Sequence, residues 1–227
     1  SSKPMATYLA FMAIGQYEII QDVAPSGLPV INAYSENLGE YATSARASIE
    51  RTSEIVEWCE GLFGPYPFEA QGGVAVAPST IGFALENQTR STYAAEFFRR
   101  GSDPYVVVHE NAHQWFGDSV AVDTWKDIWL NEGFASYAEW LWSEETGEGT
   151  ADELFEFYYT LYPATSSFWT VKPGDPGPAN IFHPAVYDRG AMAVHQIRLA
   201  IGDNAFFALL KAWTAARKDS VGNIAQF

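Results

Sequence analysis

The sequence is poor in several features, and each shortage excludes a class of protein. Cys59 is the only cysteine among 227 residues, so no disulfide can form within the chain, and we expect it to be a small buried side chain on a helix. No apolar run reaches the roughly 18 residues that a membrane-spanning helix requires. Internal repeats and low-complexity tracts are also absent, which excludes a repeat architecture and argues against a disordered chain.

Positive charge is scarce. The chain has 13 Lys and Arg against 28 Asp and Glu, a formal net charge of −15. Nucleic acids and anionic membrane surfaces both require a cationic face, so neither is an expected partner. An isoelectric point near 4.5 suits cytoplasmic and exported proteins equally, and the compartment therefore stays open.

Apolar side chains are plentiful: 48% of the residues are hydrophobic and 15% are aromatic. This composition and length predict one large domain with a complete core. The first hundred residues favour a strand over 7–20, a helix over 35–61 that ends at Gly64-Pro65-Tyr66-Pro67, and extended segments over 74–77 and 82–89.

The rest of the chain has helical patterning. Asp103-Pro104 is a start signal, because Asp accepts from the first free amides and Pro is tolerated at the first helical position. Thr124 to Asp127 resembles a capping box. The predicted helices cover 103–117, 124–145, 151–162, 184–201 and 203–217, a Pro/Gly loop covers 173–178, and the last residues are expected to lie within a helical region. Strands first and helices afterwards predict an α+β domain.

His109-Glu110-Asn111-Ala112-His113 matches the pattern H-E-x-x-H inside the first of these helices. Side chains four residues apart lie on one helical face, so both imidazoles can reach one ion. Glu110 is turned about 100° from His109, beside the ligands, where a base for a water molecule on the metal belongs. Taken alone, the pentapeptide could also be a solvated helix face.

Glu132 supplies the third ligand. Eighteen residues lie between it and His113, and it falls on the next predicted helix, so two helices joined by a short connection can deliver it to the same ion. Two His and one Glu leave an open coordination position, which is typical of a catalytic zinc site. Gly133, costly inside a helix, suggests that the two metal helices approach closely.

With these motifs the sequence resembles the gluzincin aminopeptidases, the family of aminopeptidase N and leukotriene-hydrolase-type enzymes. Phe83 to Asn87 is similar to the family's G-x-M-E-N motif, with Phe83 in place of the usual Gly, and Tyr187 to Gly190 is similar to the segment that carries its catalytic tyrosine. The resemblance implies a thermolysin-like zinc peptidase catalytic domain over 1–227, with a small N-terminal mixed sheet followed by a helical half. It also implies that the family's N-terminal β domain and C-terminal helical domain lie outside this chain.

The resemblance assigns a role to each matched residue. One Zn²⁺ per chain is expected on His109, His113 and Glu132, with Glu110 as general base. Tyr187 is expected to donate a hydrogen bond to the oxyanion. Glu86 would pair with the free amine of a peptide substrate, and Ala84 and Asn87 belong to the same substrate-binding motif.

Two further side chains, Glu139 and Asn131, are candidates to orient the metal ligands, and each also has a simpler interpretation. Glu139 lies seven residues after Glu132 and could accept from a ligand imidazole, or it could be a solvated carboxylate. Asn131, beside the ligand, could orient the site or cap local backbone groups. The two remaining histidines, His183 and His195, are not expected to bind metal.

Three functions remain open at this point. The first is an aminopeptidase that acts on peptides with a free N-terminus. The second is an endopeptidase, or a peptidase with an added hydrolase activity, on the same zinc. The third is a catalytically silent binding module, which the intact ligands, base and tyrosine disfavour, although fold alone does not imply function.

Overall fold

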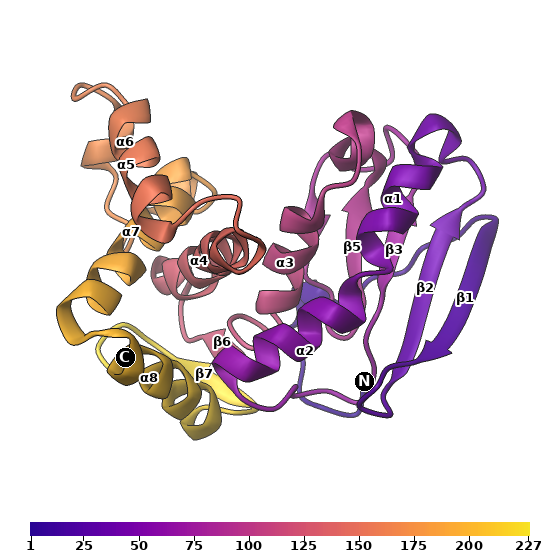
Figure 1. Cartoon of the computed structure of the whole chain (residues 1–227), viewed down its shortest axis with the longest axis horizontal. Coiled ribbons are helices and arrows are strands. Elements are labelled where there is room, and N and C mark those ends of the chain that lie inside the picture. Colours follow the sequence, from indigo (N-terminus) through magenta and orange to yellow (C-terminus); the bar gives the residue numbers. More distant parts are fainter.

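The computed structural model describes all residues from Ser1 to Phe227. The first half of the chain forms a five-stranded mixed sheet in the order β1-β2-β3-β5-β4, with helices packed beside it (Figure 1). The outer pairs β1–β2 and β4–β5 are antiparallel, and β2–β3 and β3–β5 are parallel. The strands are β1 (Tyr17–Val23), β2 (Pro29–Ser35), β3 (Gly73–Val76), β4 (Ala84–Leu85) and β5 (Ser91–Ala94).

The second half is helical and is built around a central helix, α4. Every residue of α4 from Trp129 to Ala138 is buried. The helices are α1 (Ala42–Ile49), α2 (Thr52–Phe63), α3 (Pro104–Ala112), α4 (Trp129–Thr146), α5 (Ala151–Leu161), α6 (Ser167–Thr170), α7 (Pro184–Ile201) and α8 (Asp203–Ala216), with 3₁₀ turns η1 (Thr7–Leu9), η2 (Gly39–Tyr41), η3 (Ala95–Arg100), η4 (Trp125–Asp127) and η5 (Pro178–Asn180). The predicted α+β class is confirmed. No helix combines the length and the apolar character that crossing a membrane demands.

Helices α4 and α7 touch backbone to backbone. A Cβ atom built on Gly133 would lie 3.0 Å from the Cα of Gly190, closer than nearly all real Cβ contacts. The sequence-based expectation that Gly133 serves close packing is therefore right, but its partner is α7 and not the other metal helix. This contact brings Glu132 of α4 and Tyr187 of α7 to the same side of the molecule.

The predicted strand over 7–20 is wrong for most of its length. Residues 7–9 form the 3₁₀ turn η1, residues 10–16 have no regular structure, and β1 begins only at Tyr17. The segment is also mostly exposed, because β1 is an edge strand paired only with β2 and residues 10–16 belong to no strand. Strand β2 was not predicted, because the Pro and Gly residues beside it indicate an interruption of the extended segment.

The long helix predicted over 35–61 is interrupted. Helix α1 ends at Ile49 and α2 begins at Thr52, whose hydroxyl donates to the carbonyl of Ile49 at 2.7 Å. The capping box at Thr124 is also absent, because the Thr124 hydroxyl bonds the Asp127 carboxylate and no backbone amide. A capping box does form at Thr150 and Glu153, at the start of α5.

The end of the chain differs from the expected helix. A short strand, β7 (Ser220–Gly222), pairs in parallel with β6 (Val120–Val122), which follows the metal helix α3. The helices over 184–201 and 203–217 match α7 and α8 to within a residue.

Candidate active site

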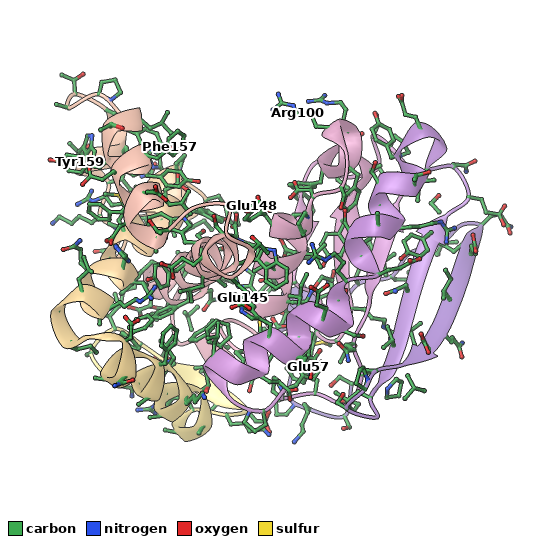
Figure 2. All side chains as sticks on the ribbon, viewed as in Figure 1. Glu57, Arg100, Glu145, Glu148, Phe157 and Tyr159 are labelled. Carbon is green, nitrogen blue, oxygen red and sulfur yellow. The ribbon has the colours of Figure 1, made fainter.

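A cleft of about 880 Å³ lies over helices α3 and α4. Asp103 caps the start of α3 by accepting from the amides of Tyr105 and Val106, as its sequence predicts, and this helix presents His109, Glu110 and His113 to the cleft. Figure 2 shows Arg100 at the end of η3 on one side of the molecule and Phe157 and Tyr159 on α5 on the other. The lining of the cleft contains no Lys or Arg. It contains five acidic side chains, Glu86, Asp103, Glu110, Glu132 and Glu139. Such a lining favours cations.

Three of the predicted ligands converge. The Oε2 atom of Glu132 lies 3.3 Å from Nε2 of His109 and 3.1 Å from Nε2 of His113. Zinc bound about 2.0–2.1 Å from each atom of a tetrahedral set keeps them roughly 3.3–3.4 Å apart. The spacing and the N, N, O donor set therefore fit zinc.

Hydrogen bonds hold both rings in a metal-binding orientation. Nδ1 of His109 lies 2.6 Å from Oε1 of Glu139, and Nδ1 of His113 lies 2.9 Å from the carbonyl oxygen of Phe116. Because a carboxylate and a carbonyl only accept, each Nδ1 donates its proton to these partners, and each Nε2, on the Glu132 side, is the atom that would bind an ion.

Burial and the two histidines act in opposite directions on the carboxylates of Glu110 and Glu132. Burial, reinforced by Glu86 and Glu132, raises the pKa of Glu110 to about 8, although the two histidines oppose this. Burial also acts to raise the pKa of Glu132, but His113 and His109 outweigh it and lower this pKa to about 2. The pKa values of the two neighbouring glutamates thus differ. The low pKa of Glu132 favours the charged form that a metal ligand needs, and the raised pKa of Glu110 means that it holds a proton more readily.

The tyrosine of the second motif faces the same cleft. Tyr187 lines it, and its ring stacks on that of His109 with 6.1 Å between the centroids. Burial, and then the charge of Glu132, raises its pKa well above the usual value. The phenol is therefore neutral and able to donate.

Glu86 lies at the end of the cleft near the C-terminus of α3. It is 7% exposed, and its carboxylate falls within 4.8 Å of ligand atoms of Glu110 and His113. The side-chain amide of Gln114 donates to the Glu86 carbonyl at 3.0 Å. Tyr105 and Val106 line the cleft about one turn before His109. The cleft therefore runs along α3, with Glu86 at one end and Tyr105 towards the other.

The remaining predicted residues lie nearby, with different surroundings. Ala84 lines the cleft from β4, whose neighbour Phe83 accepts at its carbonyl from Ala94 at 3.3 Å. Asn87 does not line the cleft, because its amide donates to the carbonyl of Leu9 at 2.8 Å. Asn131 is buried, its side-chain oxygen has no partner, and it lines a smaller hollow next to the cleft.

The two other histidines serve different contacts. His195 bonds Tyr137 and Asp152, and His183 bonds Ser167. Sequence reasoning missed Tyr8, Trp125 and Phe182, which also line the cleft. No periodicity or motif marks these aromatic side chains, and only the fold brings them to the site.

Comparison with known proteins decides the family. The model of the peptidase family M1 domain matches residues 47–226. The chain belongs to peptidase family M1. Its predicted resemblance to the gluzincin aminopeptidases is thereby confirmed.

Curated relatives of this M1 domain are aminopeptidases. It is 31% identical to human endoplasmic reticulum aminopeptidase 1 over 223 residues, which is 89% of this chain and 23% of that protein. It is 26% identical to probable aminopeptidase 2 of Sulfurisphaera tokodaii, over 89% of this chain and 28% of that one. Rabbit aminopeptidase N is 33% identical over 60% of this chain and 15% of its own length. The M1 domain thus spans less than a third of each of these relatives.

Solved structures agree. The M1 zinc metallopeptidase from Deinococcus radiodurans is 30% identical with a TM-score of 0.77, covering 92% of this chain and 46% of that one. A variant of that enzyme bound to a Tyr-Ser-Ala substrate is similar at 29% identity and the same TM-score. Zinc is therefore the metal of these structural relatives.

Proposed function

We propose that this M1 domain is the catalytic part of a zinc aminopeptidase that removes N-terminal residues from peptides. One zinc per chain would be held by His109, His113 and Glu132. The single observation that carries the exopeptidase assignment is Glu86, a carboxylate at the end of the cleft beside the metal ligands. A carboxylate there pairs with a free α-ammonium and fixes which peptide bond lies over the ion.

The cleft gives the substrate a direction. The ammonium lies at Glu86, the first peptide bond lies over His109 and His113, and the departing peptide extends past Val106 and Tyr105. Val106 and His113, the C-cap of α3, are about 10 Å apart along the helix at 1.5 Å per residue, which is the length of about three extended residues. Short peptides therefore fit along α3.

The chain's own groups account for the proton transfers. When bound, zinc acts as a Lewis acid that polarises the substrate carbonyl and lowers the pKa of water. Glu110 accepts the proton of the attacking water and passes it to the leaving amine. Tyr187, neutral and beside His109, donates to the oxygen on which negative charge develops. Glu139 keeps His109 in the required tautomer.

The test compares wild type with Glu110→Gln. We expect both proteins to bind one zinc and the variant to turn over amino-acyl anilides about 10²–10⁴ times more slowly than the wild type. The wild type should leave the N-acetylated anilides intact. Rapid cleavage of N-blocked peptides would instead favour an endopeptidase, and zinc binding without any turnover would favour a binding module.

A further inference from the structure

Tyr8 lies where the first segment of the chain crosses the end of the cleft. Its hydroxyl donates to Oε1 of Glu86 at 2.9 Å. Its ring meets the ring of Trp125 edge-on, with 5.4 Å between the centroids. Both aromatic side chains line the cleft on the Glu86 side. The matched family model begins at residue 47, so Tyr8 lies outside the matched region.

A second bond ties the same turn to the same motif. Leu9, the neighbour of Tyr8 in η1, accepts at its carbonyl from the amide of Asn87 at 2.8 Å. Leu9 is 1% exposed, so η1 is anchored in the protein and is not a loose surface turn. Glu86 is therefore held at its carbonyl by Gln114, in the turn after α3, and at its carboxylate by Tyr8 of η1.

In this contact the Tyr8 hydroxyl is the donor and the Glu86 carboxylate is the acceptor. Burial, and then the charges of Glu86 and Asp118, raise the pKa of Tyr8 far above its usual value, so the phenol stays protonated and donates. One carboxylate oxygen of Glu86 is thereby occupied. No side chain bonds the other oxygen, Oε2, and the Glu86 side chain lines the cleft. The bond fixes the rotation of the carboxylate and leaves one oxygen for an incoming cation.

We infer that Tyr8 is a positioning residue of the amine site: by holding Oε1 of Glu86 it directs Oε2 at the α-ammonium of the substrate. This inference rests on the proposed aminopeptidase function. Without the phenol oxygen, the carboxylate is free to rotate, and the ammonium must order it at the moment of binding. Tyr8 acts through Glu86 and does not itself touch the reacting atoms.

Two zinc-binding inhibitors separate this role from a general structural one. The first is phenylalanine hydroxamate, which carries the α-amine, and the second is 3-phenylpropionyl hydroxamate, which lacks only that amine. Both reach the metal through the hydroxamate. The ratio of their dissociation constants, measured by calorimetry on the zinc-loaded protein, therefore reports the amine site alone.

For Tyr8→Phe we expect phenylalanine hydroxamate to bind about tenfold more weakly, the loss typical of a hydrogen bond to a charged group. The amine-free compound should bind as it does to wild type. Tyr17→Phe is the matched control, because it makes the same change in the same N-terminal segment, where the Tyr17 hydroxyl has no hydrogen-bond partner. It should alter neither constant.

The outcomes are distinct. An unchanged ratio in Tyr8→Phe, or equal weakening of both compounds, would overturn the positioning role. Failure of both hydroxamates to bind the folded wild-type protein would instead contradict the proposed zinc site itself. Steady-state kinetics give a second readout: KM for free-amine substrates should rise in Tyr8→Phe by more than kcat falls.

Discussion

Glu139 contacts the histidine that begins the metal motif, at 2.6 Å. Sequence spacing placed it near Glu132 but could not decide between a buried partner and a solvated carboxylate. A carboxylate behind a ligand imidazole fixes its tautomer and raises its basicity. Its contribution is therefore to zinc affinity more than to the chemical step.

We expect Glu139→Ala to weaken zinc binding by about 10- to 100-fold, because His109 then loses the acceptor that orients it. Competition with a chromogenic chelator measures this affinity. Glu145→Ala is the control on the same helix, since Glu145 has no ion pair or side-chain hydrogen bond. Equal affinity in the two variants would show that Glu139 is only a solvated carboxylate.

The ionisation of Asp188, the neighbour of Tyr187, should make the stability of the fold depend on pH. Burial, partly offset by a hydrogen bond from Tyr162, raises its pKa from 3.8 to about 6. The folded state therefore binds this proton more tightly than the unfolded state. The stabilisation is complete below about pH 3.8 and is lost as the pH rises through about 6.

Asp188→Asn, which keeps an oxygen for Tyr162 to donate to, removes the buried charge. At pH 8 we expect it to stabilise the fold by on the order of 1 kcal/mol, or about 2–4 °C in Tm for a domain of this size. The gain should disappear near pH 4. Thermal melts at both pH values check this, with Asp175→Asn in the exposed Pro/Gly loop as the control. A gain that does not change with pH would contradict the buried-charge explanation.

At the scale of elements, the contact between α4 and α7 depends on two glycines. A methyl group on Gly133 would meet the backbone of Gly190 at 3.0 Å, and neither backbone can move without shifting its helix. Helix α4 carries Glu132 and α7 carries Tyr187, so the distance between these helices also sets the geometry of the site.

Gly133→Ala should therefore destabilise the fold by about 1–3 kcal/mol and lower activity as well. Gly61→Ala is the matched control in helix α2, where a Cβ would meet nothing within 4 Å. That change should be stabilising by roughly 0.5–1 kcal/mol, because Ala has the better helix propensity. Chemical denaturation of both variants measures the difference, and effects of the same sign would contradict the packing argument.

The helices were more predictable than the strands, and the reason is local. Asp103-Pro104 and the pattern over 184–201 carry their own start signals and periodicity, and α3 and α7 begin where these indicate. Strand β5 has four residues and β4 has two, so their existence depends on pairing with distant neighbours. In segment 10–16 a strand was predicted where none forms, because the apolar residues there have no strand to pair with.

The residues of the site divide in the same way, into those that local spacing predicts and those that only the fold brings together. His109, His113 and Glu132 could be found from spacing because two helices and a short connection determine where they meet. Tyr8 is 78 residues from Glu86 in the sequence, and nothing local links the two. Asn87 belongs to a recognisable motif, but only the fold reveals that its amide bonds Leu9 and that it does not line the cleft.

At the scale of the whole molecule, charge should select among substrates. The chain carries a net charge of −15, and the cleft is lined by acids without a Lys or Arg. We expect kcat/KM for lysine-rich tripeptides to fall several-fold between about 0.02 M and 0.3 M salt, while that for aspartate-rich tripeptides rises. Uncharged tripeptides are the control. The same salt dependence for all three classes would rule out electrostatic selection.

The glycine contact between α4 and α7 also bears on how the protein is made. Fifty-six residues lie between Gly133 and Gly190, so α4 is without this packing partner until α7 has been synthesised. Docking of α7 then places Tyr187 on the same cleft as Glu132. A nascent chain that stops short of α7 therefore has an incomplete cleft, which lacks the phenol of Tyr187.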